Sequence, residues 1–214
     1  MKKYLLWFSF SIVLNALGNS LLIKANLGSA PWATAAENLS SVSPFSIGLW
    51  VIILNVFSFI LSYFMKVKFT FFIVVKSILL TFIFGFLIDF FLYMQDVLYI
   101  PSHIGLRYLH LFIGLNLMAI ALCIYFQVSS VHLPSDYLIK AFGKLMNNYT
   151  VGTMICTSIP ILISVIIVIY RQQLLGLGVG TLLFMFGVGF LIDQYNRFIS
   201  FQKEHLYSET ASHS

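Results

Sequence analysis

The chain has 214 residues, of which 60% are hydrophobic and only 9% are charged, and its formal net charge is +5. A soluble domain carries roughly 25% charged residues, so this composition excludes an ordinary soluble protein. Apolar runs of about 20 residues, the length needed to cross a bilayer as a helix, recur along the whole chain. We therefore expect an all-α, multi-pass membrane protein whose partner is the lipid bilayer, with no nucleic-acid partner and no cofactor.

Six apolar segments are long enough to span the membrane. They cover residues 4–25, 45–65, 70–95, 107–128, 150–170 and 174–198. Two further segments, 31–42 and 134–147, are too short and too polar to cross. Each begins with a proline, which is favoured in the first turn of a helix. We expect both to form short helices, packed against the bundle or lying at the membrane interface.

The placement of lysine and arginine predicts how the spans are oriented. If the N-terminus is cytoplasmic, the basic residues on that side outnumber those outside by eight to three, with one more inside the third span. The cytoplasmic set is Lys2, Lys3, Lys66, Lys68, Lys140, Lys144, Arg197 and Lys203, the outer set is Lys24, Arg107 and Arg171, and Lys76 lies within the span. The positive-inside rule then places both termini in the cytoplasm, with residues 201–214 as a disordered tail.

The five-residue sequence GFLID occurs twice, at residues 85–89 and 189–193, an offset of 104. At the same offset, Ser46-Ile47-Gly48 resembles Thr150-Val151-Gly152, and Pro31 matches Pro134 at an offset of 103. Together these matches align whole units of span, short helix, span and span. They predict two halves, residues 1–98 and 99–200.

Each half contains three spans, which is an odd number. The second half must then enter the membrane from the opposite side, which gives a 3+3 inverted-topology repeat, as in many secondary transporters. The first span corresponds to the fourth, an internal span. We therefore interpret the N-terminal apolar stretch as a permanent span and not as a cleaved signal peptide.

The stretch "ALGNSLLIKANLGSAPW", followed by a polar helix and "SPFSIGLW", resembles the YczE/YyaS/YitT family of bacterial integral membrane proteins. Leu27, Gly28, Pro31, Trp32 and the Ser-Ile-Gly element carry the resemblance, which covers most of the chain outside the polar tail. It implies a multi-pass fold in the bacterial plasma membrane and implies no specific activity. The residues with an expected structural role are Gly28, Pro31, Trp32, Gly48, Pro134 and Gly152.

Two aspartates end the repeated segments, and each admits two interpretations. Asp89, near the outer end of the third span, either binds a cation, a proton or a substrate, or forms a helix cap or an ion pair with Lys24. Asp193 lies at the cytoplasmic end of the last span, with Arg197 four residues later. That spacing places both groups on one helix face and predicts a local salt bridge. If one aspartate is functional, we expect it to be Asp89.

Two residues of opposite charge, Glu37 and Lys140, occupy the same position in the two short helices. They form either a pair of gates or two solvated charges at the membrane surface. Polar residues also gather around the end of the first span, where Gly28 is expected to interrupt helix. Such a stripe is usual in helix packing, but a broken helix beside polar side chains also forms transporter sites. The binding candidates are Asn15, Asn19, Lys24, Asn26, Glu37, Asp89 and Asp193.

No catalytic constellation, metal-ligand spacing or phosphate-binding loop is present in the sequence, so we do not expect an enzyme. The leading hypothesis is a secondary transporter or permease for an unknown small solute, working by alternating access between the two repeats. The alternative is a non-transporting accessory or scaffold protein that supports another enzyme or exporter. A homodimer is compatible with either hypothesis.

Overall fold

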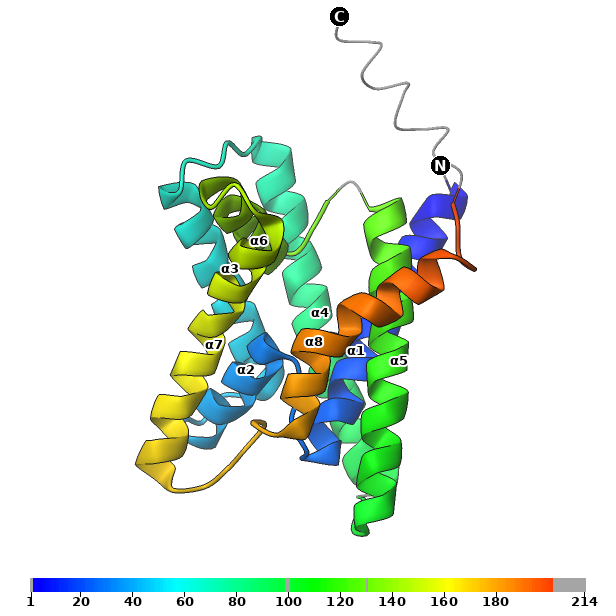
Figure 1. Cartoon of the computed structure of the whole chain (residues 1–214), viewed down its shortest axis with the longest axis vertical. Helices are drawn as coiled ribbons and strands as arrows, with labels where there is room; N and C mark the ends of the chain where they lie inside the picture. The colour runs from blue at the N-terminus through cyan, green and yellow to red at the C-terminus, as the bar shows by residue number, and fades with distance from the viewer. Residues whose placement is uncertain (1, 99–100, 130, 202–214) are drawn as a thin grey trace, which may run out of the picture.

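The structure is a computed structural model that describes residues 2–98, 101–129 and 131–201, and these residues form eight helices and no strand (Figure 1). The helices are α1 (Lys2–Ala25), α2 (Pro31–Ser41), α3 (Ile47–Phe64), α4 (Phe71–Leu98), α5 (Ile104–Val128), α6 (Pro134–Leu145), α7 (Tyr149–Arg171) and α8 (Val179–Asn196). The all-α class expected from the sequence is confirmed. The expected tail, apart from residue 201, lies outside the described residues.

Five helices are long and apolar enough to cross a membrane by length and composition. They contain the spans Tyr4–Ala25, Ile47–Phe64, Phe71–Leu98, Ile104–Val128 and Thr150–Arg171. Large apolar side chains lie exposed along them, for example Phe86 of α4 and Ile166 of α7. Such surfaces are favoured in lipid over water, which is consistent with a polytopic membrane protein. Helix α8 is not in this set, and its last four residues, Asp193 to Asn196, are polar or amphipathic.

The two short helices begin where the prolines predict, at Pro31 and Pro134, and both prolines are fully buried. Helix α2 packs against α3 and α7, and helix α6 packs against the same two helices. Most of α2 is buried, because Ala33, Ala35 and Ala36 are small enough to let its neighbours approach closely. Both short helices are therefore packed into the bundle: α2 has no exposed residue, while α6 keeps one exposed edge that carries Lys140 and Lys144.

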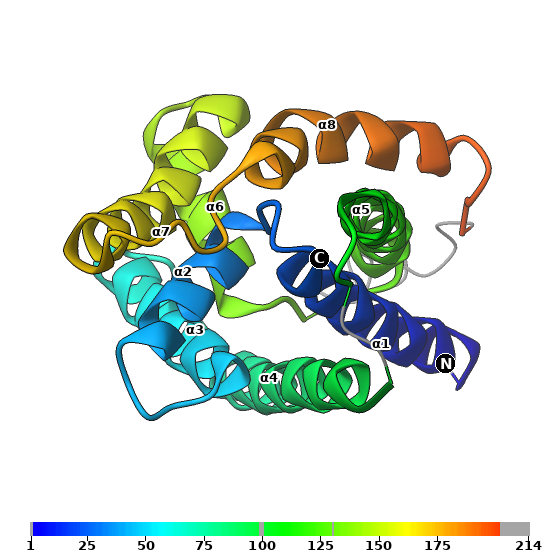
Figure 2. The same ribbon diagram turned by 90° about the horizontal axis from the view of Figure 1, so that it is seen from below.

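The eight helices form two groups (Figure 2). In one group, α1 packs between α4 and α5, and α5 also packs against α8. The other group contains α2, α3, α6 and α7. Helix α3 packs closely against α4 and joins the groups on one side, whereas α7 and α8 do not pack against each other along their described residues.

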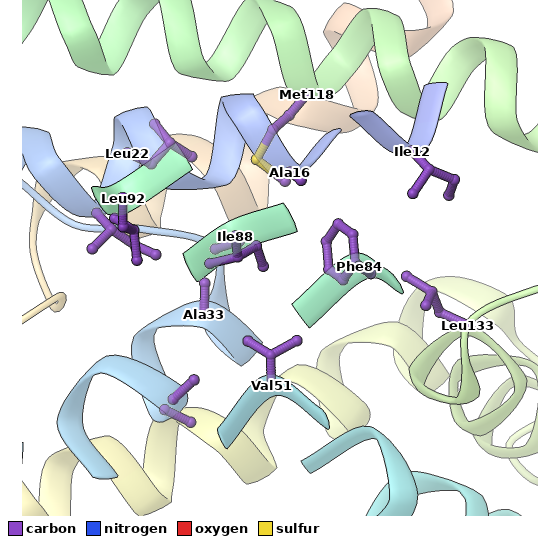
Figure 3. Close-up of a cluster of buried hydrophobic side chains, with 14 of the residues drawn as sticks. Ile12, Ala16, Leu22, Ala33, Val51, Phe84, Ile88, Leu92, Met118 and Leu133 are labelled. Atoms are coloured by element: carbon purple, nitrogen blue, oxygen red, sulfur yellow. The ribbon is translucent and has the colours of Figure 1, made fainter. Parts of the chain in front are cut away.

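The main apolar core lies where α1, α2, α3 and α4 meet. Figure 3 shows Ile88 and Phe84 of α4 between Val51 of α3, Ala33 of α2 and the side chains of α1. Burial of each large side chain of this kind contributes roughly 1.5–3 kcal/mol in water, while in lipid close packing replaces the hydrophobic effect. This core fixes α2 against the membrane-length helices.

Candidate functional site

Two connections far apart in the sequence meet beside α2. We call this region the loop junction: residues 26–30, which join α1 to α2, and residues 172–178, which join α7 to α8. The carbonyl oxygen of Gly176 accepts hydrogen bonds from Ser29 N (3.0 Å), Thr34 Oγ1 (3.0 Å) and Thr181 Oγ1 (2.9 Å). Asn38 Nδ2 donates to the carbonyl oxygen of Leu175 at 2.9 Å. The junction therefore holds the start of α8 against α2.

Gly28 is required at the junction by its backbone conformation and by its surroundings. Its φ of +113° is one that residues with a side chain rarely adopt, and a Cβ there would lie 2.6 Å from the amide nitrogen of Thr181. Gly180 N also donates to the carbonyl oxygen of Leu27 at 2.8 Å. The expected interruption of helix at Gly28 is confirmed, and the broken backbone is packed against protein, as irregular backbone in membrane proteins must be.

Glu37 of α2 directs its carboxyl group into the loop junction. Its Oε2 atom is buried and has no hydrogen-bond partner, and a side chain at Gly176 would overlap it. Burial raises the pKa of Glu37 from 4.5 to about 7, although hydrogen bonding to Ser29 and the charge of Lys24 oppose the shift. A carboxyl with such a pKa gains and loses a proton near neutral pH, which is typical of functional sites.

Lys140, at the matching position of α6, is exposed, and its Nζ lies 5.8 Å from the centre of the Tyr137 ring. The solvated-charge interpretation therefore fits Lys140 and does not fit Glu37. Equivalent positions of the two short helices are chemically unequal, and the unusual environment belongs to Glu37.

Lys24, at the end of α1, forms an ion pair with Asp96 near the end of α4. The expected pairing of Lys24 with Asp89 is wrong, because Asp96 lies seven residues further along α4 and reaches the end of α1 instead. Arg107 of α5 donates to the backbone oxygens of Ala25 (2.7 Å) and Asn26. Through these contacts, Lys24 and the backbone of Asn26 hold the ends of α1, α4 and α5 together.

Asp89 caps the start of α3. Its Oδ2 accepts a hydrogen bond from Ser46 Oγ (2.6 Å) and its Oδ1 accepts one from Gly48 N (2.7 Å). A Cβ on Gly85 would lie 2.6 Å from the Gly48 carbonyl oxygen, so glycine is needed here for the helices to approach. Of the two interpretations of Asp89, the structure supports the helix cap, since a carboxylate is stabilised at a helix N-terminus.

Asp193 is exposed and has no hydrogen bond or ion pair to any described residue, and the expected salt bridge to Arg197 does not form. Asn15 and Asn19 are both buried, and Asn19 Nδ2 donates to Asn15 Oδ1 (2.9 Å) and to the Asn15 carbonyl oxygen (3.1 Å). These two side chains are joined by a hydrogen bond on one face of α1. That arrangement supports a packing role for them.

The structure thus does not bring the sequence-derived candidates together around one carboxyl group. It places Glu37 beside the loop junction, which contains Asn26, and the neighbours of Glu37 from residues 172–178 were not predicted from the sequence. The indole N–H of Trp32 and the side-chain oxygen of Asn38 are also buried without a hydrogen-bond partner. Unpaired buried polar atoms are costly, so each of them is a candidate contact point for a bound solute.

A second polar cluster, around α6, was missed in the sequence. Tyr125 donates its hydroxyl hydrogen to Asp136 Oδ2 (2.8 Å) and accepts a hydrogen bond from Leu133 N (2.7 Å). Burial raises the pKa of Asp136 from 3.8 to about 6, and burial lowers the pKa of the adjacent His132 from 6.5 to about 4. The available signal was an aspartate two residues after the helix-starting Pro134, close to an aromatic residue at the end of α5.

Comparison with known proteins places the chain in one family. Residues 1–197 match the model of DUF6198, a family of unknown function. That description does not link the family to YczE/YyaS/YitT, so the resemblance to the latter remains an expectation. No curated protein and no solved structure matches the chain. Because the match covers all eight described helices, the protein belongs to the DUF6198 family.

Proposed function

We propose that the protein is a secondary transporter for a small solute in the bacterial plasma membrane. It has six spans arranged as two inverted three-span repeats, with both termini in the cytoplasm, and it works by alternating access. The observation that carries the proposal is the packing pattern of the helices, since it relates the two halves of the chain to each other.

Most of the pattern repeats when each helix of the first half is exchanged with the helix four places later, and the exception is the packing of α3 on α4, which α7 and α8 lack along their described residues. Helix α1 packs on α4, and α5 packs on α8; α2 packs on α3 and α7, and α6 packs on α7 and α3. The pair α1 and α5 lies at the centre of this exchange. A duplicated and inverted chain is expected to pack in this way, and the matching sequences of the two halves support the same origin.

Helix α8 is the sixth span in this proposal. Its 18 residues rise about 27 Å at 1.5 Å per residue, close to the roughly 30 Å thickness of a hydrocarbon core. Leu182, Phe186 and Phe190 are exposed at intervals of four, which gives the helix an apolar stripe facing outward. Asp193 to Asn196 then fall at the cytoplasmic interface.

Glu37 is the residue we assign to the transported solute or a coupling proton. Its carboxyl is buried among backbone groups from both halves and lacks a hydrogen-bond partner at Oε2. The basic groups nearby are engaged elsewhere: Lys24 pairs with Asp96, and Arg171 donates to the carbonyl oxygen of Ser41 at 2.8 Å. A carboxyl without a dedicated cation can exchange a proton or contact a cationic group of a solute.

The test is flux into proteoliposomes that contain the full chain and a trapped pH-sensitive dye. Amino acids, sugars, organic acids and amines are supplied in turn as probes under an imposed proton gradient. We expect saturable, gradient-dependent uptake of one class, reduced at least about tenfold in Glu37→Gln, because glutamine can neither exchange a proton nor supply the charge that a cationic group would contact. Lys140→Gln, the matched change in α6, is expected to retain uptake.

Unchanged uptake in Glu37→Gln would remove Glu37 from the site. Absence of flux with every probe class, together with one protein that co-purifies in a fixed ratio, would overturn transport in favour of an accessory role.

A further inference from the structure

The two copies of the repeated sequence make different contacts. In the first half, Asp89 of α4 accepts hydrogen bonds from Ser46 Oγ and Gly48 N at the start of α3, and Gly85 lies against Gly48. We call this four-residue contact of Ser46, Gly48, Gly85 and Asp89 the first clamp. It connects α3 of one helix group to α4 of the other.

Adding 104 to each residue number gives the matching set in the second half: Thr150, Gly152, Gly189 and Asp193. These residues are not in contact, because α7 and α8 do not pack against each other along their described residues. A Cβ on Gly189 would meet no atom within 4 Å, and both Thr150 and Asp193 are exposed. The second half therefore has the parts of a clamp without its contacts.

The start of α7 lies against a different neighbour from the start of α3. A side chain on Gly152 would overlap the backbone of Gly143 in the short helix α6, whereas a side chain on Gly48 would overlap Gly85 in the long helix α4. The same glycine of the repeat thus contacts the long helix in one half and the short helix in the other. The two repeats thus show two packing arrangements of matching elements, and an element that can adopt two discrete arrangements is what a two-state mechanism requires.

The first turn of α7 has donors available for a carboxylate. Asn148 caps the helix, since its side-chain oxygen accepts from Val151 N (3.1 Å) and its carbonyl oxygen accepts from Gly152 N (3.0 Å). Neither the hydroxyl nor the backbone N–H of Thr150 donates a hydrogen bond to a described residue. A helix N-terminus carries partial positive charge and attracts a carboxylate.

We propose that the first turn of α7 docks on the face of α8 that carries Gly189 and Asp193, where Asp193 accepts hydrogen bonds from Thr150. This second clamp rests on the proposed alternating-access function. It closes the cytoplasmic side of the bundle, while the first clamp closes the outer side. The present structure is the state with the first clamp closed and the second open.

The segment that docks on this face of α8 is the first turn of α7 from the same chain. Both partners repeat the sequence of an interface that the first half already forms, and a connection of only residues 172–178 holds α7 and α8 near each other. Position 150 carries threonine where the matching position 46 carries serine, and threonine keeps the hydroxyl that Ser46 uses in the first clamp. A second copy of the chain on this face is the competing outcome that the experiment must separate.

The experiment measures two matched distances by double electron–electron resonance on the full chain in liposomes, with Cys123 and Cys156 replaced by alanine. Spin labels at Thr157→Cys and Phe190→Cys report on α7 and α8, and labels at Ile53→Cys and Phe86→Cys report the equivalent pair on α3 and α4. Phe86 is 71% exposed although the first clamp is closed, so a label at Phe190 is not expected to block the second clamp. Thr157 bonds only to backbone of its own helix.

We expect one short distance for the α3–α4 pair and two distances for the α7–α8 pair. The shorter of the two α7–α8 distances is expected to equal the α3–α4 distance. Asp89→Asn, which weakens the first clamp, is expected to raise the proportion of the short α7–α8 distance by about tenfold. A hydrogen bond to a charged group changes an equilibrium constant by about this factor. Thr150→Ala is expected to remove the short α7–α8 distance and to leave the α3–α4 distance unchanged. The unchanged α3–α4 distance also shows that the variant is folded.

A single long α7–α8 distance in the unsubstituted protein, in Asp89→Asn and in Thr150→Ala would overturn the proposal. A short distance that disappears on dilution with unlabelled protein would also overturn it, because the occupant would then be a second copy. The readout needs no solute, so it is independent of the flux assay: a second clamp without flux refutes transport, and flux without a second clamp refutes the clamp.

Discussion

The Ser46 hydroxyl donates a 2.6 Å hydrogen bond to the carboxylate of Asp89, which lies 43 residues later in the sequence. Because Gly48 N donates to the same carboxylate, both oxygens of Asp89 are used in capping α3. The first GFLID copy is therefore one half of a helix–helix contact whose other half is the Ser-Ile-Gly element.

Asp89→Asn is expected to lower thermal stability in detergent, and Asp193→Asn is expected to change it little. The first substitution weakens two hydrogen bonds to a charged acceptor, each worth about 1.5–3 kcal/mol, while Asp193 has no hydrogen bond to a described residue. The measurement is the midpoint of thermal unfolding, followed by loss of monodisperse protein on gel filtration. Equal shifts in the two variants would contradict the cap interpretation.

Glu37→Gln is expected to flatten the dependence of stability on pH. The pKa of Glu37 is about 7 in the folded protein and 4.5 when unperturbed, so the folded state holds more protons than the unfolded state between these values. Stability from this group is complete below about pH 4.5 and decreases as the pH rises through about 7.

Thermal midpoints of wild type and Glu37→Gln, measured from about pH 5 to about pH 8, check this prediction by their difference. Asp136, with a pKa of about 6, contributes a slope of the same sign, and His132, with a pKa of about 4, contributes one of opposite sign. Both are present in both proteins and cancel in the difference. Parallel curves would show that Glu37 is not buried in the way described.

Gly28→Ala is expected to reduce the yield and stability of folded protein. A φ of +113° is strained for alanine by roughly 1–2 kcal/mol, and the new Cβ would also press against Thr181 at the start of α8. The matched control is Gly105→Ala, because a Cβ on Gly105 meets no atom within 4 Å. Thermal unfolding of the two purified variants makes the comparison, and a Gly28→Ala protein as stable as the control would be inconsistent with this packing.

The orientation and the sixth span are tested by labelling single cysteines in intact cells with a membrane-impermeant maleimide. Native Cys123 and Cys156 are buried and are replaced by alanine. We expect Arg171→Cys to react from outside, and Lys144→Cys and Ser200→Cys to react only after permeabilisation, because α7 and α8 each cross the membrane once in the proposed topology. Reaction of Ser200→Cys in intact cells would mean that α8 does not span.

Much of the architecture was open to prediction because it depends on local composition. Apolar length predicted five helices that are long and apolar enough to span a membrane, while the sixth expected span, α8, is not among them. Pro31 and Pro134 predicted where the short helices begin, since proline fits the first helical turn. The pairing of charged groups was not open to prediction in this way. Lys24 pairs with Asp96 and not with Asp89, because the angle between α1 and α4 decides which turn of α4 lies beside the end of α1.

The sequence by itself determined that the chain is a bundle of membrane-length helices with a repeated segment, because bilayer thickness and the needs of backbone hydrogen bonding leave few alternatives. Only the tertiary structure decided what the two copies of GFLID do. Identical pentapeptides end in one aspartate that caps a helix and one that is exposed, since α4 packs on α3 while α8 lies away from α7. The burial of Glu37 against Gly176 was likewise decided by the packing of α2 against the loop of residues 172–178, as the Asn38–Leu175 hydrogen bond across 137 residues illustrates.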